Sequence, residues 1–132
     1  MAGNQQIGGA ATVAAGASYV IYSRDSRGDL LGRRITVCVA GKTATAWRVV
    51  LEFFDGTNWV TADAAVKAAL TPAVDPPAGS TGNTDTPGTH PASYTDAVRK
   101  EWIVTDQCRV LVENTGSGTL TFSYNVREQI GY

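Results

Sequence analysis

The chain has 132 residues, of which 43% are hydrophobic and 17% charged, and its formal net charge is -1. This length and composition suit one globular domain with a single core and are too apolar for a disordered chain. A nearly neutral chain lacks the general attraction to phosphate backbones and anionic lipids, so neither nucleic acid nor a membrane is an expected partner. We expect no export signal, because the N-terminus has no basic region followed by an apolar core, and no membrane span.

Residues 1–17 are rich in glycine and alanine and show no strand period. They predict a flexible or extended N-terminal arm, followed by a single domain over residues 18–132. The run SYVIY at 18–22 is the first β-rich segment. After it, SRDSRGDLLGRR places four arginines among Asp25 and Asp29, which predicts a charged hairpin tip on the surface. These arginines are Arg24, Arg27, Arg33 and Arg34.

The next two strand signals are stronger. Residues 33–41 place Ile35, Val37 and Val39 on one face. Residues 46–54 are apolar on both faces, so their sequence leaves open which face is core. The turn residues Asp55-Gly56-Thr57-Asn58 then lead into Trp59 and Val60, which predicts a hairpin.

A short helix and a long loop are expected in the middle of the chain. Asp63 is placed to cap a helix over residues 64–70, which would end near Pro72. Residues 71–96 contain all five prolines and have no packing period. Structureless loops of this length are uncommon in compact domains and tend to be functional or disordered.

Three strand signals complete the chain. Residues 98–105 place Trp102 and Val104 on one face and Ile103 on the other, and residues 108–114 and 120–128 alternate in the same way. The NTGSG sequence between the last two predicts a C-terminal hairpin. Together the signals predict a mostly β fold, an antiparallel β-sandwich of jelly-roll or Ig-like type with one short helix and a long Pro/Gly-rich loop.

The sequence offers no catalytic set, so we expect no enzyme, no cofactor and no metal. Its only histidine, His90, lies in the proline-rich loop, which is a poor platform for a general base. The aspartates fall largely at turns and caps, although a dispersed acidic pair of a hydrolase stays a weak alternative. Cys38 and Cys108 lack metal-site spacing and are expected to be buried small hydrophobes or, as an alternative, a disulfide.

Aromatic side chains indicate a second possible class of function, the binding of a carbohydrate. A flat ring at the surface could stack on a sugar, as in carbohydrate-binding sandwiches, and Trp59 beside its turn and Tyr94 are the candidates. A glycan is therefore an alternative partner.

Two segments carry a resemblance to a known family. VVLEFFDGTNWVTAD and CRVLVENTGSGTLTFSYNVRE resemble small β-sandwich virion proteins of tailed bacteriophages, among them capsid decoration or cement proteins. The resemblance implies a homo-oligomer, with a trimer suiting a capsid three-fold position, bound to the major capsid protein on the virion surface after synthesis in the host cytoplasm. A tail or neck component is the alternative within this class.

The two long non-periodic segments would gain order on a neighbour, and they supply most of the expected partner contacts. These candidate contacts are Ile7, Val13, Trp59, Pro76, Pro77, His90 and Tyr94.

Overall fold

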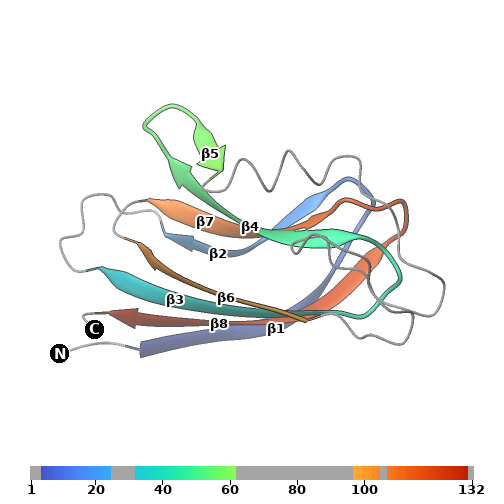
Figure 1. Cartoon of the computed structure of the whole chain (residues 1–132), viewed down its shortest axis with the longest axis horizontal. Coiled ribbons are helices and arrows are strands. Elements are labelled where there is room, and N and C mark those ends of the chain that lie inside the picture. The colour runs from blue at the N-terminus through green and yellow to red at the C-terminus, as the bar shows by residue number, and fades with distance from the viewer. Residues whose placement is uncertain (1–3, 25–31, 62–96, 105–106, 131–132) are drawn as a thin grey trace.

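The computed structural model describes residues 4–24, 32–61, 97–104 and 107–130, and within these ranges the chain forms eight strands and no helix (Figure 1). The strands are β1 (Asn4–Val13), β2 (Ser18–Arg24), β3 (Arg33–Gly41), β4 (Trp47–Phe54), β5 (Trp59–Thr61), β6 (Ala97–Val104), β7 (Cys108–Asn114) and β8 (Leu120–Ile130). The mostly β prediction is confirmed for this part of the chain. The helix expected at residues 64–70 and the loop at 71–96 lie outside the described residues.

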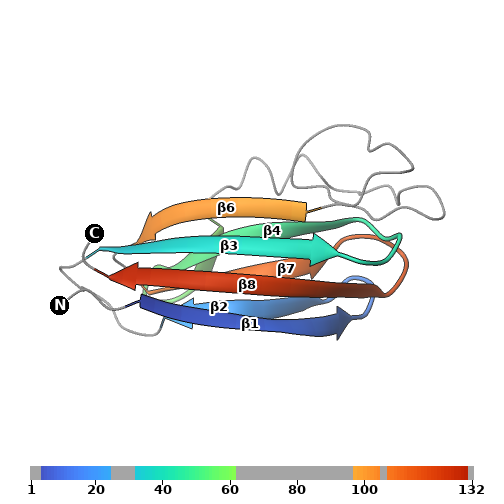
Figure 2. The same ribbon diagram turned by 90° about the horizontal axis from the view of Figure 1, so that it is seen from below.

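The strands form two four-stranded sheets in which every neighbouring pair is antiparallel. Sheet A has the order β1-β8-β3-β6, and sheet B has the order β2-β7-β4-β5. The two sheets lie one over the other as layers (Figures 1 and 2). β1 and β2 end the two sheets on one side of the molecule, while β6 and β5 end them on the other.

The core lies between the two sheets. Inward-facing apolar side chains alternate along the central strands, as a period of two requires. Those with 1% exposure or less include Leu120, Phe122 and Val126 of β8, Ile35, Val37 and Val39 of β3, Val110 and Val112 of β7, and Trp47 of β4. The inward faces predicted for β3, β7 and β8 are therefore confirmed, and for β4, whose sequence left the choice open, the inward face is the one with Trp47.

The outer face of sheet B explains why the sequence of β4 has apolar residues on both faces. Val50 points outward there and is nonetheless buried. Two ion pairs between β4 and β7 flank it, with Arg48 Nε 2.9 Å from Glu113 Oε2 and Arg109 Nη2 2.8 Å from Glu52 Oε1. The face that packs in the core is the one that carries Trp47.

A close approach of the two sheets places Trp47. A Cβ at Gly41, the last residue of β3, would lie 2.5 Å from Trp47 Nε1 and 2.8 Å from Trp47 Cε2. Cβ atoms do not come this close to ring atoms, so the indole of β4 can occupy this position only because residue 41 is glycine.

The N-terminal segment differs from its prediction as an arm apart from the domain. Residues 4–13 form β1, which pairs with β8 from Asn4↔Gln129 to Val13↔Leu120. The sequence of β1 does not show the alternation of apolar and polar residues that is typical of a strand. The reason is that β1 is an edge strand rich in glycine, alanine and glutamine, and it contributes mainly Val13 to the core. Pairing along the edge of the long β8 strand holds these residues in the sheet.

The predicted C-terminal hairpin is wrong, because β7 belongs to sheet B and β8 to sheet A. The connection between them crosses from one sheet to the other and is fastened by the buried Asn114. Its Nδ2 donates to the carbonyl oxygens of Gly118, at 2.7 Å, and Val13, at 3.1 Å, while its Oδ1 accepts from Thr45 Oγ1 at 3.1 Å. Side-chain bonds of this kind satisfy backbone groups that a hairpin ladder would otherwise pair.

The β4–β5 hairpin is confirmed. Asp55 Oδ1 accepts backbone N–H bonds from Thr57 at 2.8 Å and from Asn58 at 2.7 Å, and Gly56 has a φ of 106°. The aspartate closes the turn through its own side chain, and glycine supplies the positive φ.

The arginines expected on a charged hairpin tip have separate roles, because β2 and β3 lie in different sheets. Arg24 is buried and its Nη1 donates to the carbonyl of Val104 at 3.3 Å. Arg33 Nη1 lies 3.0 Å from Glu128 Oε1, and the hydroxyl of the buried Tyr22 donates to the same carboxylate. Tyr22, Arg33 and Glu128 thus form a polar cluster that joins β2 of sheet B to β3 and β8 of sheet A.

The Tyr22 hydroxyl should make stability fall in alkaline solution. Burial, and then the hydrogen bond to Glu128, raise the pKa of Tyr22 well above its ordinary value of 10.0. As pH rises, the unfolded chain therefore loses this proton before the folded chain does. The contribution of Tyr22 to the free energy of unfolding is complete below about pH 10. Above this pH it falls by about 1.4 kcal/mol per pH unit until the raised pKa is reached. Urea unfolding of wild type and Tyr22→Phe between pH 8 and 11 measures it, and equal losses in both proteins would contradict the assignment.

Candidate functional site

One lateral edge of the molecule exposes several large apolar side chains. Exposed large hydrophobic side chains in the described residues all lie on the four edge strands: Ile7 (42%) on β1, Tyr19 (38%) and Val20 (43%) on β2, Val60 (48%) on β5 and Ile103 (56%) on β6. Three of the five belong to β1 and β2, which lie on the same side (Figure 2). We call this side, with Ile7, Tyr19 and Val20, the open edge.

The β1 strand of the open edge lacks two of the features that usually protect a sheet edge, charged residues and proline. β1, with the sequence NQQIGGAATV, contains no charged residue and no proline over ten positions. Natural edge strands are commonly blunted by charges, proline or short length, because their unpaired backbone groups attract other strands. An edge strand of this length and composition is suited to contact another protein chain.

Aromatic rings support the open edge from inside. Tyr19 of β2 reaches sheet A, where its ring centroid lies 5.9 Å from that of Phe122 and 6.2 Å from that of Tyr124. A Cβ at Gly9 would lie 3.0 Å from the Tyr124 hydroxyl oxygen, so glycine lets this ring lie against β1. Burial and the hydrogen bond with Tyr19 raise the pKa of Tyr124. The two tyrosines therefore join β2 to sheet A next to the exposed side chains.

The opposite side is protected. β6 carries Arg99, Lys100 and Glu101 in sequence at its centre, and β5 is only three residues long. Charges and short length both oppose strand addition. The two sides of the molecule thus differ in kind, although both present exposed apolar side chains.

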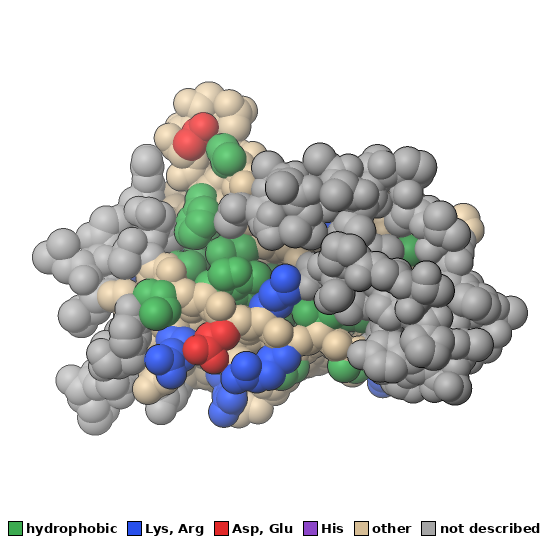
Figure 3. Space-filling model, viewed as in Figure 1, with side chains coloured by type: hydrophobic (Ala, Val, Ile, Leu, Met, Phe, Trp, Pro, Cys, Tyr) green, Lys and Arg blue, Asp and Glu red, His purple; other side chains and the backbone are tan. Residues whose placement is uncertain are grey.

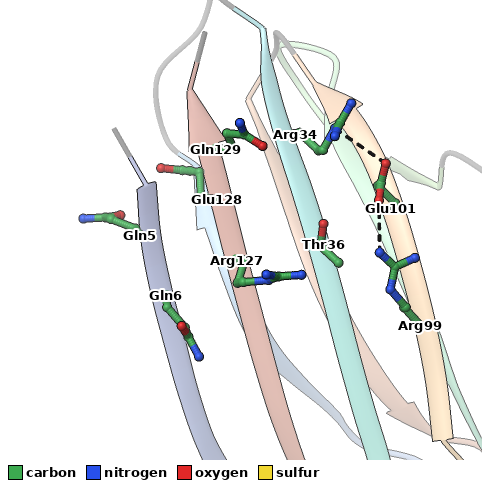
Figure 4. Close-up of a pocket in the computed structure, with 9 residues that line it drawn as sticks. All are labelled: Gln5, Gln6, Arg34, Thr36, Arg99, Glu101, Arg127, Glu128 and Gln129. Atoms are coloured by element: carbon green, nitrogen blue, oxygen red, sulfur yellow. Dashed lines mark hydrogen bonds and ion pairs between the residues drawn. The ribbon is translucent and has the colours of Figure 1, made fainter. Parts of the chain in front are cut away.

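A second surface lies on the outer face of sheet A. A hollow of about 500 Å³ is lined by Gln5, Gln6, Arg34, Thr36, Arg99, Glu101, Arg127, Glu128 and Gln129 (Figure 4). In the register of the sheet, Gln6, Arg127, Thr36 and Glu101 form one row across all four strands. We call this surface the arginine basin, after Arg34, Arg99 and Arg127.

One carboxylate serves two of these arginines. Glu101 Oε1 lies 3.5 Å from Arg34 Nε, and its Oε2 lies 3.3 Å from Arg99 Nη2. Arg127 points across the sheet toward Thr36, and within the described part of the chain it makes no ion pair (Figure 4). The space-filling view shows basic side chains gathered around an acidic one where Figure 1 places β3, β6 and β8 (Figure 3).

The structure separates the partner contacts expected from the sequence. Ile7 lies on the open edge, whereas Val13 is buried in the core and does not face a partner. Pro76, Pro77, His90 and Tyr94 lie outside the described residues.

Trp59 has neighbours within the fold. Its ring centroid lies 5.2 Å from that of Phe54, and the Arg109 guanidinium carbon lies 4.2 Å from the ring centroid. These contacts account for the half-buried Trp59 through packing and a cation–π interaction, without a sugar.

The cysteines are free, so the disulfide alternative is wrong. Cys108 is buried on the inner face of sheet B, as expected, but Cys38 is exposed on the outer face of sheet A. In the register of sheet A, Cys38 stands opposite Arg99 and Asn125. The period of β3 explains the exposure, because Cys38 lies between the inward-facing Val37 and Val39.

Among the described residues, no three His, Cys, Asp or Glu side chains gather where they could hold a metal ion. None of the described segments is a helix that could cross a membrane. The sequence predicted Ile7 of the open edge as a contact, but it indicated neither the whole edge nor the basin. Alternation alone placed Arg34, Thr36 and Arg127 outward, but their meeting depends on the strand order.

Comparison with known proteins adds little. No family model matches the chain, and no curated protein matches it. A solved structure from work describing Bacillus endospore appendages as a family of disulfide-linked pili is similar at 16% identity, covers 96% of this chain and 86% of that one, and has a TM-score of 0.42. At this identity and TM-score the likeness carries no argument about function.

Proposed function

We propose that this protein is a non-catalytic structural protein that works by assembly, and that it is a capsid decoration or cement protein of a tailed bacteriophage virion. The observation that carries the assembly role is the open edge, where Ile7, Tyr19 and Val20 are exposed on two edge strands without charge or proline over β1. The virion assignment rests on the sequence resemblance of residues 46–63 and 108–128.

The strand order supports this proposal by analogy. Two four-stranded antiparallel sheets ordered β1-β8-β3-β6 and β2-β7-β4-β5 correspond to a jelly roll, which is the finer fold we propose. Jelly rolls occur in viral capsid proteins and in lectins, so the fold alone does not choose between them. The contacts of Trp59 with Phe54 and Arg109 weigh against the lectin-like role.

In the proposed assembly, copies of the chain meet through their open edges. Burying these apolar side chains stabilises association, since each large apolar side chain removed from water contributes about 1.5 to 3 kcal/mol. A closed oligomer is the form that such contacts favour, and a trimer would place three open edges around a capsid three-fold axis.

The double variant Ile7→Lys/Val20→Lys tests this proposal. We expect it to reduce a wild-type oligomer, measured by light scattering after size exclusion, to the 13.9 kDa monomer, because buried lysine charges oppose the contact. The matched control is Val60→Lys/Ile103→Lys, which makes the same chemical change on the opposite side and should leave the mass unchanged.

Monomeric wild-type protein, or an equal effect of both double variants, would count against the open edge. The virion assignment has its own readout: antibodies to the purified chain should label phage heads released by the cell that encodes it. Label on tails or necks would favour the tail component, and the absence of label from particles would reject the virion role while leaving the oligomer result intact.

A further inference from the structure

We propose that the arginine basin binds the carboxylate groups of an acidic protein segment. It is a second site, and it lies on the outer face of sheet A. The open edge lies along the edge strands β1 of sheet A and β2 of sheet B. Three observations support it: the local charge, the position of Arg127 and the limited extent of the basic surface.

The basin has an excess of positive charge in a chain of net charge -1. Arg34, Arg99 and Arg127 come from three different strands, and Glu101 is the carboxylate that lies among them on this face. Glu128 also lines the hollow, but its carboxylate takes part in the inner cluster with Arg33 and Tyr22. Among the described residues that line the hollow, arginine side chains therefore outnumber the carboxylates that face them, which suits a ligand that carries carboxylates.

The shape of the basin follows from one short side chain among long ones. Thr36 lies in the same row as Gln6, Arg127 and Glu101, and its small side chain leaves space between them. The Arg127 guanidinium points into this space (Figure 4). A guanidinium donates two parallel N–H bonds to a planar carboxylate, so this geometry suits a ligand carboxylate above Thr36.

The extent of the surface favours an acidic protein segment over a nucleic acid. On the same face, the row of Ala10, Ser123 and Ala40 carries no charge, so among the described residues the arginines do not continue toward that end of the sheet. Nucleic-acid backbones are bound by many spaced cationic contacts. A compact group of three arginines instead matches a few neighbouring Asp or Glu side chains.

The test is a titration of the full chain with an acetylated tetra-glutamate peptide, followed by the backbone amide NMR signals. We expect shifts confined to residues near Arg34, Arg99 and Arg127, and affinity that falls as salt is added. Arg127→Gln should weaken binding about fivefold, since a partly exposed ion pair contributes up to about 1 kcal/mol. Glu101→Gln should tighten binding about threefold, because the carboxylate that competes for Arg34 and Arg99 is removed.

The matched control is Lys42→Gln, which removes one exposed positive charge just beyond the other end of β3 and should change affinity less than twofold. A tetra-glutamine peptide should not bind. Equal weakening by Arg127→Gln and Lys42→Gln would show attraction to overall charge and overturn the site, as would an unchanged affinity in Glu101→Gln. Inorganic phosphate or a short oligonucleotide that competes at concentrations equal to the peptide would overturn the carboxylate assignment.

This inference does not depend on the proposed function. A basin that fails to bind the peptide leaves the oligomer measurement on the open edge unchanged, and a monomeric protein can still bind the peptide.

Discussion

Replacing Glu128 by alanine is expected to lower the free energy of unfolding by about 3 kcal/mol, because it breaks a largely buried ion pair. The Glu128 side chain is 6% exposed; its carboxylate pairs with Arg33 of β3 and accepts the hydroxyl hydrogen of Tyr22 of β2. The substitution leaves the buried Tyr22 hydroxyl without this partner and removes a link between the two sheets. Urea unfolding at pH 7 measures the loss.

Glu101→Ala is the matched control for this experiment. Glu101 also lies in sheet A and also pairs with arginine, but its side chain is 40% exposed. Exposed ion pairs contribute about 0.2 to 1 kcal/mol, so this variant should lie close to wild type. Glu128→Gln keeps the shape and the acceptor oxygen and should fall between the two. A loss in Glu128→Ala no larger than in Glu101→Ala would show that the cluster does not stabilise the fold.

The substitution Trp47→Ala is expected to cost about 3 to 5 kcal/mol, the range found when a large aromatic side chain is removed from a core. Trp47 is fully buried and lies against Gly41, so its removal opens a cavity between β4 and β3. Thermal unfolding followed by circular dichroism measures the loss. If the alanine variant is unfolded, Trp47→Phe is measured in its place. Phenylalanine removes less of the side chain, so this variant should lose less free energy of unfolding.

A second substitution at the same contact provides the control for Trp47. In the Trp47→Ala background, Gly41→Ala should cost less than in wild type, because the ring atoms that the new Cβ would meet are gone. Additive effects of the two substitutions would mean that the contact between Gly41 and the indole does not determine the packing there.

The open edge and the arginine basin are the two separate surfaces at which we propose contacts. The edge presents the apolar side chains of Ile7, Tyr19 and Val20, which suit contact between copies, while the basin presents charge, which suits recognition of a different, acidic chain. A decoration protein that binds both its own copies and a capsid subunit would use both, and the variants above separate the two contributions.

Local pattern was enough to predict most strands. The segments 33–41 and 108–114 match β3 and β7 at both ends, and the β4–β5 hairpin follows from Asp55 and Gly56. Alternation also placed Ile103 on the face opposite Trp102 and Val104, and in the structure Ile103 is exposed while Val104 is buried. These features depend on residues that are one to four positions apart, so they can be predicted from the sequence without knowledge of the fold.

What tertiary structure decided is which strands became neighbours. β1 has too little apolar alternation to be recognised alone and exists as a strand because β8 pairs with it. The NTGSG segment has the composition of a hairpin turn, yet it crosses between the sheets, held by Asn114. Likewise, Arg127 and Thr36 are far apart in sequence and meet only through the order β8-β3. The sequence by itself determined most of the strands and the inward faces of β3, β7 and β8, because side-chain alternation is local. The open edge and the basin result from pairing between strands that are far apart in the sequence. The free energy of strand pairing depends on which strands become neighbours, and no local pattern specifies this.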